Sequence, residues 1–211
     1  MDQAAKTKPY HHGDLRQAML EEAARMIEAD GLEGLSLRAM ARAVGVTHAA
    51  PANHFGDLTG LLSELAADGY RAFTAALASA VDAAGADVTA RGRAMAHAYV
   101  RFARERPGMF TLMFRSERLD AERPALKDAI AAARQALQSS IAEQNGGAAG
   151  SPSVALAQAT ARWSLVHGYA VLLLEGRLKG ALTALPDETG GTGLFDAVLD
   201  AINFQDKEPD V

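Results

Sequence analysis

The sequence predicts an all-α protein with a small N-terminal helix-turn-helix domain and a larger C-terminal helical bundle. Apolar residues recur at helical spacing along most of the chain, alanine is abundant, and aromatic residues make up only 6%. No segment shows the strict alternation or the β-branched runs that are typical of strands. The 211 residues, 49% of them hydrophobic, suffice for one small and one larger domain.

The first helix is expected at residues 14–29, after a flexible arm at residues 1–12. Its apolar side chains fall on one face at helical spacing, and they are Leu15, Ala18, Met19, Ala23, Met26 and Ile27. Gly31 and Gly34 then mark the connection to the next helix.

Residues 36–55 predict two short helices joined by a tight turn. The first of these helices carries an apolar stripe formed by Leu37, Met40, Ala41 and Val44. Ser36 stands where an N-cap belongs, Gly45 can supply a positive φ in the turn, and Thr47 is expected to cap the second helix. Such a helix-turn-helix can insert its second helix into the major groove of DNA, and an ordinary helical hairpin is the alternative.

The rest of the chain is expected to be helical as well. Asp57 is a candidate N-cap for a long helix that fades near Gly85. Further helices are expected at residues 89–106, 109–115, 121–144, 154–179 and 195–204. This pattern divides the chain into a helix-turn-helix domain at 13–57, a larger helical domain at 58–205, and a tail at 206–211.

Composition narrows the classes of function. The chain has no cysteine, and it shows no zinc motif, di-iron motif or glycine-rich phosphate loop, so we expect neither an enzyme nor a cofactor or metal site. The nearly uncharged run at residues 163–174 is too short to cross a bilayer, and the first nine residues lack the apolar core of a secretory signal. We therefore expect a cytoplasmic protein with no membrane partner.

Net charge argues against a strongly basic DNA-binding protein. The formal charge is −5, and the residues up to Gly56 carry six basic against seven acidic side chains. The distribution of charge matters more than its sum, because most of these acids fall on the first helix or at its end. We expect a local positive patch and modest non-specific affinity for DNA.

Several motifs occur in an order that resembles a known family. The segments Gly45-Val46-Thr47, His54-Phe55 and Leu61-Leu62 follow the Asp30-Gly31 helix end. Together with the start Tyr10-His-His-Gly-Asp-Leu-Arg16, they resemble the DNA-binding domain of TetR-family transcriptional regulators. The segments 163–168 and 106–114 are similar to the C-terminal domain of a subclass marked by Trp-x-x-x-His-Gly.

This resemblance implies a ligand-responsive transcriptional regulator that binds double-stranded DNA as a homodimer. A repressor is favoured over an activator. It would bind a palindromic operator whose half-sites lie about 34–36 Å apart or a multiple of that. A small apolar effector would release it from the operator.

The candidates for DNA contact lie on both short helices and in the residues just before each of them. They are Ser36, Arg38, Arg42, Thr47, His48, Ala49, Asn53 and His54. Arg38 and Arg42 could hold backbone phosphates, with a solvated helix face as the alternative, and His48 could contact a base or a phosphate.

Two positions depart from the family pattern. Ala52 stands where many members have tyrosine, and Leu58 stands where many have lysine. The alternative function is therefore a helical small-molecule-binding protein of the same fold whose DNA binding is weak or lost.

The resemblance also implies an effector pocket in the C-terminal domain. Its candidates are the aromatic and soft side chains Met95, Tyr99, Phe102, Phe110, Met113, Phe114, Trp163 and His167. Ordinary core packing is the alternative for the apolar candidates. A neutral imidazole in an apolar helix needs a hydrogen-bond partner, so His167 is expected to meet either a ligand or a protein group.

The expected helix at 154–179 is apolar nearly all round, which indicates burial on two sides. One side can pack on its own domain and the other on a second copy of the chain. The alternative is a central helix within a monomer. The candidate dimer contacts are Leu165, Gly168, Leu172, Phe195, Val198 and Leu199.

Overall fold

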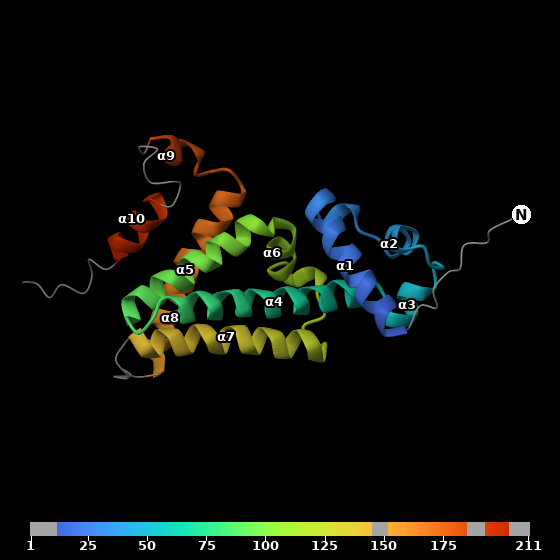
Figure 1. Ribbon diagram of the computed structural model, residues 1–211, viewed down its shortest axis with the longest axis horizontal. Coiled ribbons are helices and arrows are strands. Elements are labelled where there is room, and N and C mark those ends of the chain that lie inside the picture. The colour runs from blue at the N-terminus through green and yellow to red at the C-terminus, as the bar shows by residue number, and fades with distance from the viewer. Residues whose placement is uncertain (1–11, 145–151, 185–192, 203–211) are drawn as a thin grey trace, which may run out of the picture. The chain divides into compact units, whose positions relative to one another are not determined.

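The computed structural model describes residues 12–144, 152–184 and 193–202, and every regular element in these ranges is a helix (Figure 1). The chain forms two compact units. The first comprises the residues up to Ala72 together with Arg106–Ala133, and the second comprises Phe73–Glu105 and the residues from Arg134 onward. The predicted all-α fold is confirmed. The predicted arm before His12 and the tail at 206–211 lie outside the described residues.

The α-helices among the described residues run in the order α1 (His12–Asp30), α2 (Leu37–Val44), α3 (Ala50–Phe55), α4 (Leu58–Ala83), α5 (Val88–Glu105), α6 (Pro107–Met113), α7 (Pro124–Gln144), α8 (Pro152–Leu174), α9 (Lys179–Thr183) and α10 (Gly193–Ile202). Two short 3₁₀ turns, η1 (Leu32–Gly34) and η2 (Ser116–Arg118), lie between them.

The first helix of the helix-turn-helix begins and ends as its sequence predicts. The Ser36 hydroxyl accepts a hydrogen bond from the Ala39 amide at 3.1 Å, which caps α2. Gly45 follows α2 with φ 75°, a left-handed conformation that glycine adopts without a Cβ penalty. The next amide, that of Val46, donates to the Ala41 carbonyl at 2.9 Å and completes the turn.

The second helix begins later than predicted, and the expected Thr47 cap is wrong. Helix α3 starts at Ala50, and no side chain caps it. A helix capped at Thr47 would need the amide of residue 51 to donate to the Thr47 carbonyl, and Pro51 has no N–H. Instead the Ala50 amide donates to that carbonyl at 3.0 Å, and Pro51 lies in the first turn of α3, where its ring is tolerated.

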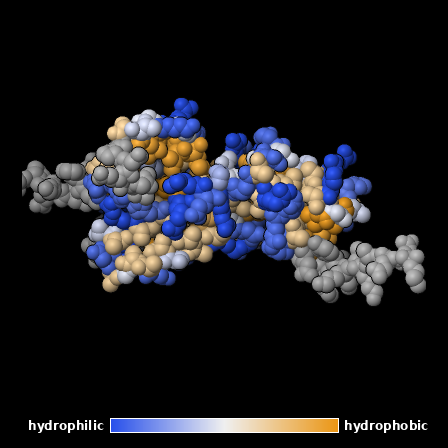
Figure 2. All heavy atoms as spheres, turned by 45° about the horizontal axis from the view of Figure 1, so that its top comes forward, coloured by the Kyte–Doolittle hydropathy of each residue, from blue (hydrophilic) through white to orange (hydrophobic). Residues whose placement is uncertain are grey.

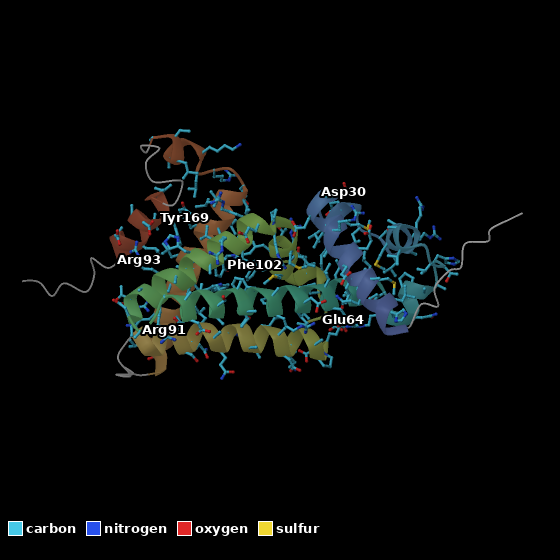
Figure 3. All side chains as sticks on the ribbon, in the orientation of Figure 1. Asp30, Glu64, Arg91, Arg93, Phe102 and Tyr169 are labelled. Atoms are coloured by element: carbon cyan, nitrogen blue, oxygen red, sulfur yellow. The ribbon has the colours of Figure 1, made fainter. Side chains whose placement is uncertain are left out.

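A half-buried glutamate on α4 joins this helix to α1 and to the residue just before α7. Asp57 Oδ1 accepts from the Gly60 amide at 2.7 Å, so the predicted cap of α4 is confirmed. Glu64, labelled in Figure 3, lies one turn after Gly60, and it binds Arg16 of α1 at 2.6 Å and Arg123, just before α7, at 2.8 Å. Fully buried apolar side chains fill the core around them, and the largest are Met19, Ile27, Met40, Leu61, Leu65, Phe110, Leu112 and Leu126.

Prolines set the starts of α6 and α7. The predicted helix at 109–115 runs from Pro107 to Met113, and the predicted helix at 121–144 starts at Pro124. The missing N–H of proline costs nothing in the first turn of a helix. Pro107 therefore begins α6 two residues earlier than predicted, while α5 ends at Glu105, one residue from its predicted end before Pro107.

The second unit has its own apolar core, formed where α5, α8 and α10 meet. Ala96 and Val100 of α5 are buried against Tyr169 of α8 and Phe195 of α10. At the edge of this cluster Arg93 binds the carboxylates of Asp196 at 2.6 Å and Asp200 at 2.5 Å. These ion pairs join α10 to α5, and Figure 3 labels Arg93 and Tyr169.

The predicted helix at 154–179 is wrong at its C-terminal end. Helix α8 ends at Leu174, and Gly176 turns the chain with φ 70°. The amides of Gly176 and Arg177 donate to the carbonyls of Leu173 and Leu172 at 3.0 and 2.9 Å, an arrangement that closes a helix. A separate short helix, α9, follows. No helix in the described part of the chain is long and apolar enough to span a membrane.

Candidate nucleic-acid interface

Two arginines and a histidine surround an open hollow on the helix-turn-helix. Arg38 and Arg42 lie one turn apart on α2, and His48 lies in the turn before α3. All three side chains are exposed, and together with Ala41 and Val46 they line the hollow. An anionic group that entered this hollow would meet two guanidinium groups and an imidazole ring.

Arg38 and Arg42 differ from the other arginines of α1 and α2. Arg16 binds Glu64, and Arg25 binds Glu22 one turn earlier on its own helix. No ion pair to Arg38 or Arg42 is found among the residues that the structure describes. Their charges therefore face solvent and are available to an external anion.

Burial and hydrogen bonding act in opposite directions on the pKa of the carboxyl group that holds Arg16. Partial burial of Glu64 by itself raises its pKa. The hydrogen bond from Arg123 and the positive charges of Arg16 and Arg123 outweigh this effect, so the pKa lies below its ordinary value. Glu64 is therefore ionised at neutral pH, and it keeps Arg16 on the inner side of α1.

The remaining candidates for DNA contact have different surroundings. Thr47, Ala49 and Asn53 are exposed in the turn and on α3, whereas His54 is half-buried beside the Phe55 ring. The Ser36 hydroxyl is used in capping α2. Ala52, one of the two departures from the family pattern, is exposed, and the other, Leu58, is half-buried.

Two apolar residues, Ala41 of the buried α2 stripe and Val46 of the turn, also line the hollow, a role that the sequence pattern does not predict. Their apolar character gave no signal that they would also line a hollow.

The candidates for effector contact fall in both units. In the second unit the Tyr99 hydroxyl and His167 Nδ1 lie 2.9 Å apart in a hydrogen bond. The Phe73 ring packs edge-on against Tyr99 at 4.9 Å and against Phe102 at 5.2 Å between centroids. Burial lowers the pKa of His167, so its ring is neutral at physiological pH. Of the two partners expected for His167, the structure shows a protein group, the Tyr99 hydroxyl.

Three other candidates belong to the core of the first unit. Phe110 and Met113 are buried on α6, and the Phe114 ring packs on Phe110 at 4.9 Å. The Tyr70 hydroxyl donates to the Met113 carbonyl at 2.9 Å, which holds the end of α6 on α4. The sequence alone did not separate this group from the candidates of the second unit.

Helix α8 has a broad face that its own unit leaves uncovered. Trp163 and Leu172 are 40% and 41% exposed, and no atom lies within 4 Å of where a Cβ on Gly168 would be. Figure 2 shows that apolar residues (orange) also reach the surface of this unit. Phe195, by contrast, is only 3% exposed inside the protomer, and Val198 and Leu199 pack against the same cluster.

Comparison with known proteins identifies the family. Residues 92–202, more than half of the chain, match the family described as tetracyclin repressor-like, C-terminal domain. The chain belongs to the tetracyclin repressor-like (TetR) family. No curated protein matches its sequence.

Solved structures show the same TetR fold along most of the chain. A protein of unknown function from Rhodococcus sp. RHA1 is 36% identical, with a TM-score of 0.75 over 92% of this chain and 98% of the other. The putative regulatory protein SCO4313 is 24% identical, with a TM-score of 0.68 over 92% of this chain and 98% of the other. The TetR family transcriptional regulator PfmR from Thermus thermophilus is 24% identical, with a TM-score of 0.59 over 86% of this chain and 97% of the other.

Proposed function

We propose that this TetR-family protein is a homodimeric, ligand-responsive transcriptional repressor. Residues 13–57 would bind a palindromic operator, and residues 58–205 would bind a small apolar effector and a second copy of the chain. The observation that carries the proposal is the hollow lined by Arg38, Arg42 and His48, whose basic side chains are exposed beside a helix-turn-helix. This is the charge distribution that a phosphate backbone requires.

In the proposed complex, α3 and the turn before it enter the major groove. Arg38 and Arg42 bind phosphates and so fix the position of the domain, while His48, Ala49 and Asn53 reach base edges. The small side chain of Ala49 is exposed and permits close approach to the groove. Thr47 and His54 add contacts at the two ends of this segment.

We infer that α8 provides the dimer contact. Its uncovered face carries Leu165, Gly168 and Leu172, and the open space at Gly168 suits the close approach of a second helix. Phe195 is covered within its own protomer, so we assign it to the support of α10 and not to the interface itself. Val198 and Leu199 remain candidates at the edge of the interface.

The effector would bind the second unit near the aromatic cluster of Phe73, Tyr99 and Phe102. The apolar rings favour an apolar ligand, and the Tyr99–His167 pair offers polar groups that could orient it. To release the operator, the effector must bind the DNA-incompetent state more tightly than the DNA-bound state. Assignment to the Trp-x-x-x-His-Gly subclass stays a prediction.

One observation favours a second candidate function, that of a small-molecule-binding protein with little DNA affinity. Ala52 is exposed on α3 but too short to reach a phosphate, so a contact expected from the family resemblance is missing.

Selection from a random DNA library at low salt distinguishes the two functions. The purified dimer is incubated with the library, and the retained DNA is sequenced. An enriched palindrome that R42A binds more weakly supports the repressor. No enrichment, with the protein folded and dimeric, supports the second candidate.

A further inference from the structure

The end of α1 holds the start of α6 through one carboxylate. Glu28 Oε2 accepts a hydrogen bond from the Gly108 amide at 2.9 Å, and Oε1 accepts one from the Met109 amide at 3.0 Å. Both amides lie in the first turn of α6, where a helix provides no acceptor of its own. Arg106, at the N-cap position, supplies no side-chain cap. Glu28 therefore caps α6 from a different helix.

The two backbones also meet directly at this point. A Cβ on Gly108 would lie 2.4 Å from the Ile27 carbonyl oxygen and 3.0 Å from the Glu28 amide nitrogen. Real Cβ atoms do not approach backbone atoms this closely, so only glycine permits the contact. The first turn of α6 thus rests on the last turns of α1, and Figure 1 shows the two helices in contact in the first unit.

A second carboxylate holds the segment that follows α6. Glu33 of η1 binds Arg118 of η2 at 2.6 Å. An exposed pair of this kind contributes little by itself. Its position matters, however, because η1 links α1 to Ser36, where α2 begins. Glu28, at the end of α1, thus holds the start of α6, and Glu33, in η1, holds η2.

We propose that Glu28 is a positioning residue for operator recognition, because it fixes the helix-turn-helix on α6. A carboxylate repels DNA phosphates, so Glu28 acts through α6 and not by touching DNA. The first turn of α6 follows α5 after the single residue Arg106, and α5 packs on α8, the helix proposed for the dimer contact. In the dimer we therefore expect this attachment to limit the distances that two recognition helices can span, and so to narrow the range of half-site spacings that the protein accepts. This inference rests on the proposed DNA-binding function.

The first test measures the contact itself by amide hydrogen exchange in the full-length protein. Glu28→Gln is compared with Glu21→Gln, which removes the same charge from an exposed position of α1 where Glu21 accepts a hydrogen bond from Gln17. The Gly108 and Met109 amides should be protected in the unaltered protein and in E21Q. In E28Q they should exchange about tenfold faster or more. Equal exchange in all three proteins overturns the proposal.

The second test measures half-site spacing, using a library of the selected half-site in pairs with variable spacers. The unaltered protein and E21Q should enrich one narrow spacing. E28Q should recognise the same half-site over a wider range of spacings and bind the preferred spacing about tenfold more weakly. A general gain in DNA affinity from the lost negative charge would appear in E21Q as well.

The outcomes separate this proposal from the proposed function. If the unaltered protein enriches no palindrome, both fail. If it does, and E28Q keeps the same spacing and affinity, only the positioning role is overturned. Should E28Q fail to fold, Glu28→Asp replaces it, because it keeps the charge but shortens the reach by one methylene, and it should broaden the spacing in the same way.

Discussion

Gly60→Ala should separate α3, the proposed recognition helix, from α4. A Cβ at this position of α4 would lie 2.0 Å from the Phe55 carbonyl oxygen and 2.8 Å from a guanidinium nitrogen of Arg123. The arginine side chain can move away, but the carbonyl is backbone at the end of α3. The last turn of α3 and the first turn of α4 must therefore move apart.

Two opposing effects determine how much G60A lowers the free energy of unfolding. An alanine methyl favours a helix over glycine by up to about 1 kcal/mol. Overpacking against atoms that cannot rotate away costs about 1–3 kcal/mol. We therefore expect the free energy of unfolding to fall by about 1–2 kcal/mol, with weaker operator binding because α3 is displaced.

The assay is urea unfolding followed by far-UV circular dichroism, with Gly180→Ala as the control. Gly180 lies in α9, and a Cβ added there would lie in open space, so its substitution should leave the free energy of unfolding unchanged or raise it by up to about 1 kcal/mol. If the urea midpoint of G60A equals or exceeds that of the unaltered protein, the close approach of Phe55 and Gly60 is refuted.

Three further predictions concern the proposed DNA-binding surface, the ion pairs of Glu64, and α8. Arg42→Ala should reduce the slope of log K against log salt by about 2 per dimer, because about one phosphate contact is lost in each subunit; fluorescence anisotropy at several salt concentrations measures this. Glu64→Gln should flatten the loss of thermal stability in acid. The folded-state pKa of Glu64 is lowered, so its contribution is complete above the unfolded pKa of about 4.3 and is lost as pH falls through the folded value. Gly168→Leu should raise the dimer dissociation constant at least about tenfold in sedimentation experiments, because its side chain fills the space proposed for the partner helix.

Each of these predictions has a matched control. Arg101→Ala removes an exposed arginine from α5 and should leave the salt slope unchanged. Glu117→Gln removes an exposed glutamate 3.9 Å from Arg115 and should leave the acid limb unchanged. Gly180→Leu should leave the dimer intact. If a control variant changes the measured quantity as much as the variant it is matched with, the reasoning behind that prediction is contradicted.

Local signals made the helix-turn-helix predictable from the sequence. The Ser36 cap, the left-handed Gly45 and the Asp57 cap each depend on residues within a few positions, and all three are confirmed. The prediction failed at Thr47. Threonine is a favourable capping residue, but Pro51 has no N–H to make the first hydrogen bond of a helix that begins there. The prediction failed again where Gly176 ends α8, because the apolar pattern continues beyond the turn.

Contacts between distant residues could not be predicted in the same way. Glu28 and Gly108 are 80 positions apart, and Arg93 and Asp196 are 103 apart. Helical spacing places a residue on one face of its own helix, but it does not say which other helix that face meets. The effector candidates show the consequence, since Phe110 and Tyr99 have the same apolar character and lie in the cores of different units.

The structure also explains how a nearly neutral domain can offer a basic surface. Three acids of α1 and η1 have partners within the protein: Glu22 binds Arg25, Glu28 caps α6, and Glu33 binds Arg118. The partners of Glu28 and Glu33 lie beyond residue 56. A sum of the formal charges over residues 1–56 therefore counts these acids but omits the groups that compensate them. Arg38 and Arg42 receive no such compensation among the described residues and remain exposed. The charge that DNA would meet is therefore set by which acids are already engaged, and a net charge of −5 is compatible with a basic DNA-facing surface.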